Sequence, residues 1–150
     1  MSLANPKPEP QVLHLTRRLA ATREAVFSAL TEAEALGRWF GPKGCTVKVI
    51  SLDLRPGGAY SLEFHGDSGS FHPLTGTYLE IEAPERLVMT WIWGKGGYAG
   101  IETRVAFELR DVDGGTELSL THENLAGLEA RDEHQGGWTS TLDCLESYLA

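Results

Sequence analysis

Five histidines are the side chains in this sequence best suited to acid–base or metal-binding chemistry near neutral pH. They are His14, His65, His72, His122 and His134. No two of them stand at HxH or HxxxH spacing, and their acidic neighbours Glu123 and Glu133 are each adjacent to a histidine in the chain. Adjacent side chains on a strand point to opposite faces, so such pairs do not converge on one ion. We therefore predict no metal site and no cofactor.

His122 has a second interpretation, because it ends the last predicted strand close to the start of the final predicted helix. A neutral imidazole there could bond a ligand carbonyl or transfer a proton, with Tyr60 or Tyr78 as its partner. The simpler alternative, which we favour, is a histidine bonded to loop backbone. The chain contains no GxSxG motif, and Cys144 falls on an apolar helix face, where a buried thiol is usually inert. We assign no catalytic residue and keep an enzyme as an alternative function.

Large aromatic side chains fall on the inward faces of several predicted elements, and these faces would converge on one space. With one histidine and one leucine they form our candidate cavity lining. These residues are Trp39, Tyr60, Phe64, Tyr78, Trp91, Trp93, Phe107, His122, Trp138 and Leu142. The alternative is that the rings fill a solid core, a role that suits Phe107. Trp39, Trp91 and Trp93 lie near the ends of their elements, and we expect them at the cavity mouth.

The stretch from Asp132 to Leu149 must position several of these side chains. Its apolar residues recur at helical spacing, at Trp138, Leu142, Leu145 and Leu149. This spacing predicts an amphipathic helix with one continuous apolar stripe. Such a stripe needs a partner surface.

That surface is a sheet, because the chain from Thr46 to His122 reads as alternating strands joined by short turns. One further strand comes first, and two helices follow it, beginning at Thr22 and at a predicted capping box, Thr31 to Glu34. The predicted strands cover residues 11–20, 46–54, 60–65, 76–81, 87–93, 101–109 and 117–122. Short turns between antiparallel neighbours make a meander. The sequence thus predicts an α+β fold, β-α-α-β6-α, whose curved antiparallel sheet of about seven strands wraps around a long C-terminal helix.

Arg17 is the one charged residue on the apolar face of the first predicted strand, in register with Leu13, Leu15 and Leu19. An inward arginine could anchor a ligand carboxylate, or its long side chain could reach the edge of the sheet. We favour the edge.

Length and charge narrow the classes of partner. A chain of 150 residues fits one domain, which we place at residues 11–150 after a disordered lead at residues 1–10. The formal charge of −8 disfavours nucleic acid and anionic membrane surfaces. No apolar run approaches the roughly 20 residues that span a bilayer, so we expect no membrane insertion. Cys45 and Cys144 form no CxxC pair, which fits a reduced, cytoplasmic location.

Several short motifs, weak alone, occur in a specific order and spacing. They are Thr22 to Leu30, Leu36 to Pro42, Asp53 to Gly58, Gly76 to Tyr78, Pro84 to Leu87 and His134 to Trp138. In this order the chain resembles the START and Bet v 1-like superfamily. It is most similar to the branch named for the C-terminal domain of the activator of Hsp90 ATPase.

The resemblance implies a helix-grip fold with a cavity between the sheet and the C-terminal helix, and a hydrophobic small molecule as the partner. It spans residues 12–149 and does not include the additional N-terminal domain with which the eukaryotic activator grips its chaperone. A chaperone partner is therefore a weaker alternative. An enzyme of the cyclase, aromatase or hydrolase type is a second alternative, and a homodimer also stays open.

Overall fold

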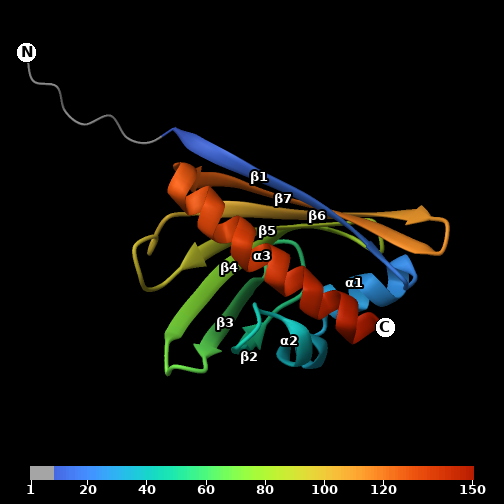
Figure 1. The fold of residues 1–150 in the computed structure, drawn as a ribbon, viewed down its shortest axis with the longest axis horizontal. Coiled ribbons are helices and arrows are strands. Elements are labelled where there is room, and N and C mark those ends of the chain that lie inside the picture. The colour runs from blue at the N-terminus through green and yellow to red at the C-terminus, as the bar shows by residue number, and fades with distance from the viewer. Residues whose placement is uncertain (1–8) are drawn as a thin grey trace, which may run out of the picture.

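The computed structural model describes residues 9–150, and its elements follow the predicted order, β-α-α-β6-α (Figure 1). The helices are α1 (Arg23–Thr31), α2 (Ala33–Trp39) and α3 (Leu128–Leu149). The strands are β1 (Pro10–Leu19), β2 (Cys45–Leu52), β3 (Ala59–Gly66), β4 (Phe71–Glu82), β5 (Arg86–Trp93), β6 (Thr103–Val112) and β7 (Gly115–Ala126). Most of the predicted lead, residues 1–8, lies outside the described residues.

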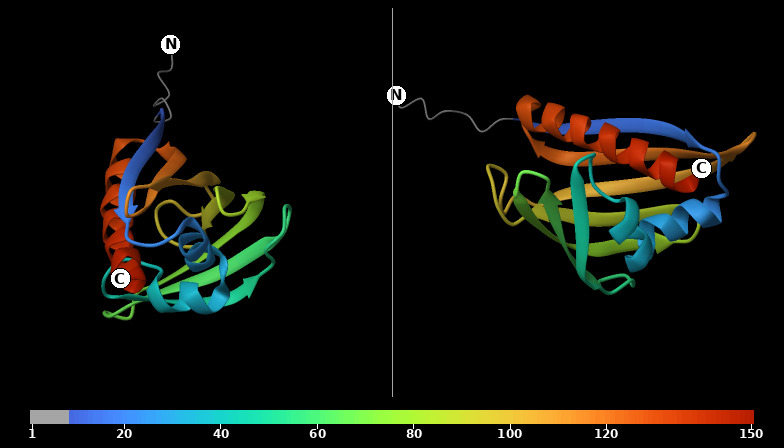
Figure 2. Two further views of the ribbon diagram at one scale, coloured as in Figure 1. Left: turned by 90° about the vertical axis from the view of Figure 1, so that its right-hand side faces the viewer. Right: turned by 60° about the horizontal axis from the view of Figure 1, so that its bottom comes forward.

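All seven strands form one antiparallel sheet in the order β1-β7-β6-β5-β4-β3-β2. Strands β2 to β7 are neighbours in chain order, which confirms the predicted meander. Strand β1 pairs with β7, so the segment that contains α1 and α2 connects one edge of the sheet to the other. Figure 2 shows the sheet bent, with the helices on its concave side. The predicted helix-grip fold is confirmed.

The end of β7 and the start of α3 differ from the prediction. Strand β7 continues to Ala126 because its last residues pair with β1, where Ala126 lies opposite Pro10. Gly127 then turns the chain with φ of 98°, in the left-handed region that glycine adopts readily, and α3 begins at Leu128. The sequence between His122 and Asp132 shows no clear alternation, so the register with β1 sets this boundary rather than a local pattern.

The two short helices confirm one predicted cap and correct the other. The Thr22 side chain accepts a hydrogen bond from the amide of Ala25 over 3.1 Å, as an N-cap does. The predicted capping box at Thr31 is wrong. Thr31 is the last residue of α1, and its hydroxyl donates to the carbonyl of Phe27 over 2.8 Å, while Glu32 precedes α2 without a side-chain cap bond.

The concave side of the sheet and the inner faces of the helices form the core. Leu142 and Leu145 of α3 are fully buried, and α3 contacts β1, β7, α1 and α2. Gly76 of β4 is required by close packing, because a Cβ there would lie 2.5 Å from the phenol of Tyr60 and 2.1 Å from the carbonyl of Thr90. The pairing of β2 with β3 contains a register shift between Val49 and Ser51.

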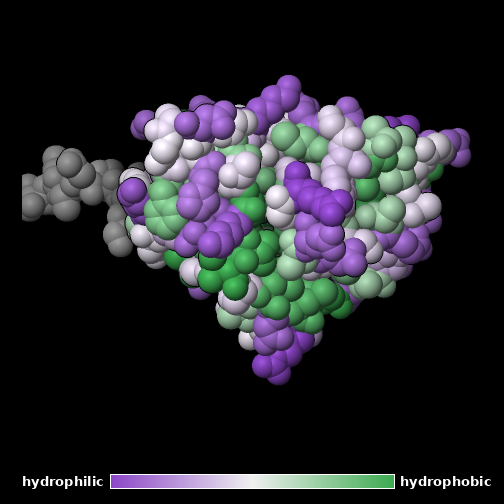
Figure 3. Space-filling model, turned by 90° about the horizontal axis from the view of Figure 1, so that it is seen from below, coloured by the Kyte–Doolittle hydropathy of each residue, from purple (hydrophilic) through white to green (hydrophobic). Residues whose placement is uncertain are grey.

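Apolar residues also gather on part of the surface. On the lower side of the molecule as drawn in Figure 1, they form a continuous area surrounded by polar residues (Figure 3). Among residues 9–150, no helix is long and apolar enough to cross a membrane.

Candidate ligand-binding site

A cavity of about 340 Å³ lies between the sheet and the N-terminal half of α3. Its walls come from the start of β2, from β3, β4 and β5, from the segment after α2, from the loop between β5 and β6, and from α3. The lining residues are Phe40, Pro42, Cys45, Phe64, His72, Trp91, Trp93, Lys95, Gly96, Gly97, Tyr98, Glu133, His134, Gly137, Trp138 and Thr141. Lys95, Gly96, Gly97, His72 and Glu133 are exposed, so the cavity opens to solvent among them.

Aromatic rings form the inner wall. Trp91 packs against Trp138 and Trp93, with ring centroids 5.1 and 5.5 Å apart. Phe64 packs edge-on against Trp93 at 5.2 Å, and Phe40 lies 6.0 Å from Trp138. These tilted and edge-to-face arrangements are the ones that aromatic pairs favour, and their rings leave an apolar surface facing the cavity.

A buried hydrogen-bond chain supports this wall from behind. The indole N–H of Trp138 donates to Nδ1 of His122 over 3.0 Å, so the imidazole proton lies on Nε2. Nε2 lies 2.7 Å from the hydroxyl of Thr103, which in turn donates to the carbonyl of Trp91 over 2.7 Å. Burial and, to a lesser extent, nearby His134 lower the pKa of His122 to about 3. The imidazole is therefore neutral, with both nitrogens occupied.

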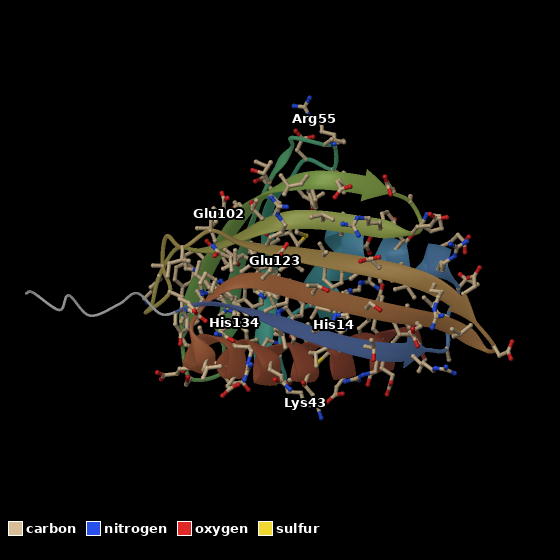
Figure 4. All side chains as sticks on the ribbon, turned by 90° about the horizontal axis from the view of Figure 1, so that it is seen from above. His14, Lys43, Arg55, Glu102, Glu123 and His134 are labelled. Carbon is tan, nitrogen blue, oxygen red and sulfur yellow. The ribbon has the colours of Figure 1, made fainter. Side chains whose placement is uncertain are left out.

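The mouth is held by two contacts from α3. Trp93 donates its indole N–H to Nε2 of His134 over 3.0 Å, and Nδ1 of His134 lies 2.7 Å from the carbonyl of Ala130. The phenol of Tyr98 donates to a carboxylate oxygen of Glu133 over 2.8 Å, and this bond raises the pKa of Tyr98 to about 12. Figure 4 shows His134 on α3, beside the β1 edge of the sheet. Together, Trp93 and Tyr98 tie the β5–β6 loop region to the helix.

A family model described as activator of Hsp90 ATPase homolog 1-like protein matches residues 20–150. The chain belongs to this family. This match confirms the resemblance to the activator of Hsp90 ATPase branch that the sequence motifs indicated. The matched residues cover nearly all of the described chain.

Solved structures carry the same fold. Protein CV1439 from Chromobacterium violaceum is 30% identical, with a TM-score of 0.84 over 92% of this chain and 96% of that one. The AHSA1 protein from Silicibacter pomeroyi is 28% identical, with a TM-score of 0.83 over 93% of this chain and 97% of that one. No curated protein is similar enough to this chain to count as a match.

Four of the ten residues predicted to line the cavity do so in this protein: Phe64, Trp91, Trp93 and Trp138. Three others, Tyr60, Tyr78 and Phe107, line a separate void of about 10 Å³, which is about the size of one water molecule.

The remaining three lie in the core. The indole of Trp39 donates to the carbonyl of Ala29 over 2.8 Å, so this residue is not at the mouth. Leu142 packs in the core, and His122 lies behind Trp91 and Trp138.

Neither sequence interpretation of His122 matches its surroundings. It is fully buried within β7, and its partners are side chains rather than loop backbone. The phenol groups of Tyr60 and Tyr78, the predicted proton-transfer partners, are also poorly placed to exchange protons near neutral pH. The phenol of Tyr60 donates to the carbonyl of Thr90, burial raises its pKa, and burial raises the pKa of Tyr78 to about 12.

Arg17 does not line the cavity; its partly exposed side chain lies at the β1 edge of the sheet, which agrees with the edge position favoured from the sequence. It pairs with Asp143 of α3 over 2.7 Å and lies 3.8 Å from Glu146.

Arg55, in the turn after β2, projects on the far side of the molecule from α3 (Figure 4). Among the described residues, no three potential metal ligands come together.

Sequence reasoning missed most of the rim. His134, Gly137, Trp138 and Thr141 share one helical face, at i, i+3, i+4 and i+7, and this spacing was the available signal. His134, Gly137 and Thr141 are polar or small, so this face is not recognisable as part of the apolar stripe, which starts at Trp138. Tyr98 and Lys95 belong to a glycine-rich loop for which sequence periodicity gives no position.

Proposed function

We propose that this protein binds a hydrophobic small molecule in the cavity between the sheet and α3. The observation that carries the proposal is the aromatic inner wall of a cavity of about 340 Å³. Pockets that enclose small ligands typically measure about 300–1,000 Å³ and are lined mainly by apolar and aromatic side chains. This cavity falls at the small end of that range, so it suits a compact molecule.

The distribution of charged residues around the cavity supports a ligand whose buried part is uncharged. Charged lining residues are confined to the exposed rim, where Lys95 carries a positive charge and Glu133 is bonded to Tyr98. A ligand charge placed against the rings of Trp91 and Phe64 would lose its hydration without an ionic partner. The buried part of the ligand is therefore apolar, and any charged group lies at the mouth.

An enzyme in the same cavity is the less supported candidate. Proton transfer needs an ionisable group that can approach a bound molecule. His122 has both nitrogens occupied, and Tyr60 bonds to backbone. Binding explains the cavity without requiring these groups to be released.

Native mass spectrometry and thermal shifts across a panel of lipids and aromatic compounds test the proposal. We expect at least one compact aromatic compound to bind with 1:1 stoichiometry and to raise the melting temperature. Chemically diverse compounds that all fail to bind or stabilise the protein would contradict it.

A further inference from the structure

The indole N–H of Trp91, in the cavity wall, is a donor without a partner among residues 9–150. Of the four tryptophans, Trp39, Trp93 and Trp138 donate to Ala29, His134 and His122. Trp91 lines the cavity and is 4% exposed, but among the described residues its Nε1 has no hydrogen-bond partner. A buried donor without an acceptor is unfavourable, and structures rarely keep one without a reason.

The neighbouring polar groups are already occupied. His122, whose ring centroid lies 5.7 Å from that of Trp91, accepts from Trp138 through Nδ1 and has Nε2 against Thr103. The hydroxyl of Thr103 donates to the backbone carbonyl of Trp91. The other close neighbours are rings, with the centroids of Phe40 and Phe64 6.1 and 6.3 Å away. No neighbouring polar side chain is left to accept from this N–H, so a bound molecule can supply the acceptor.

We propose that Trp91 selects ligands that carry an uncharged oxygen acceptor, such as an aromatic ketone, and donates its N–H to that oxygen. The inference rests on the proposed function and adds a specificity-determining residue to it. Because Nε1 of Trp91 is buried, the ligand displaces neighbouring side chains from this atom as it enters. Water and the faces of these rings are the competing partners of the N–H.

Benzophenone and diphenylmethane form a matched pair of probes, because they differ by a carbonyl in place of a methylene between two phenyl rings. We expect benzophenone to bind about five- to tenfold more tightly, as one net hydrogen bond provides. Titration calorimetry gives both dissociation constants. In ¹H–¹⁵N spectra the Trp91 indole signal, identified by its absence in Trp91→Phe, should move downfield with benzophenone and less with diphenylmethane.

Two variants separate this role from general packing. In Trp91→Phe the preference for benzophenone should vanish or reverse, because the buried carbonyl then has no donor. Trp93→Phe removes a donor that is already paired with His134, so both affinities can change but their ratio should persist.

Equal affinity of both probes for the unmodified protein, or an unchanged ratio in Trp91→Phe, would overturn this inference and leave the binding cavity standing. If neither probe binds, the proposal that Trp91 selects aromatic ketones is contradicted. If the wider compound panel also failed, the proposed function would fall with it.

Discussion

Trp138 of α3 and His122 of β7 are joined by a buried hydrogen bond of 3.0 Å, from the indole N–H to Nδ1. This bond links the helix to β7, the strand next to the β1 edge of the sheet, behind the inner wall of the cavity. It fixes the tautomer of His122 and the orientation of the Trp138 ring at the same time. One contact thus contributes to both the docking of α3 and the shape of the cavity wall.

Replacing Trp138 with alanine should be among the most damaging single changes in the chain. Removing a buried tryptophan ring typically costs about 3 to 5 kcal/mol, and here it also leaves Nδ1 of His122 without its donor. Denaturant titration measures the loss. Leu128→Ala is the control, because Leu128 is a large apolar residue on the same helix that is 58% exposed, and it should cost little. An unchanged free energy of unfolding for Trp138→Ala would show that α3 is not docked as described.

The buried neutral His122 should make the protein less stable in mild acid. Its folded-state pKa of about 3 lies below the ordinary value of 6.5, so the unfolded chain binds the extra proton as the pH falls below 6.5. The contribution of His122 to stability is complete above that pH and declines toward pH 3. The expected loss between pH 7 and pH 5 is about 2 kcal/mol from this group.

His122→Gln isolates this effect, because an amide can accept from Trp138 and donate to Thr103 without titrating in this range. The difference between the pH profiles of the two proteins, measured by chemical denaturation, cancels the contributions of the other histidines. Parallel profiles from pH 7 to pH 5 would contradict a neutral, buried His122.

The bond from Tyr98 to Glu133 should control the motion of the loop at the cavity mouth. Tyr98→Phe removes an exposed hydrogen bond, so we expect global stability to change by less than about 0.5 kcal/mol. The loop amides of Ala99, Gly100 and Ile101, which donate to loop and strand carbonyls, should exchange with solvent several-fold faster.

Hydrogen-exchange measurements by NMR read these amides one by one. Tyr148→Phe is the matched control, since Tyr148 is 40% exposed near the end of α3 and outside the cavity lining. Equal protection of the three amides in Tyr98→Phe and the unmodified protein would mean that the bond does not restrain the loop.

The ion pair between Arg17 and Asp143 should contribute measurably to the docking of α3 on β1. Their side chains are 21% and 48% exposed, so solvent weakens the interaction, and we expect a coupling of about 0.5 to 1 kcal/mol. A double-mutant cycle with Arg17→Gln and Asp143→Asn measures it. The more exposed pair Arg38–Glu34, within α2, should give a smaller value, and a coupling near zero for Arg17–Asp143 would count against the contact.

The fold could be predicted from the sequence because most of its helices and strands have a clear pattern of apolar and polar residues. The alternation around Phe107 and the stripe from Trp138 to Leu149 each identify one buried face. The ends of helices and strands were harder to predict where contacts with distant residues determine them. Ala126, for example, belongs to β7 because it pairs with Pro10 of β1. Thr31 is a second example. The sequence predicts that it caps a new helix, but the preceding helix, α1, continues through it.

The site was harder to predict because alternation gives the face of a side chain and not its depth along the strand. Tyr60 and Phe64 share one face of β3, but Tyr60 lies at the small void and Phe64 at the cavity. Sequence periodicity also cannot show that an indole such as Trp91 lacks an acceptor, since that depends on partners from β6, β7 and α3.

The most direct test of the cavity as a binding site uses the two neighbouring glycines of α3. Gly137 lines the cavity, Gly136 does not, and a Cβ at either position meets no atom within 4 Å. Leucine at either position should preserve or raise stability, because glycine weakens a helix interior by roughly 0.5 to 1 kcal/mol. The measurement is the affinity, in both variants, of a compound that binds the unmodified protein. Gly137→Leu should fill the cavity and reduce binding at least tenfold, while Gly136→Leu binds normally; unaltered binding by a folded Gly137→Leu variant would contradict the assignment of this cavity as the ligand site.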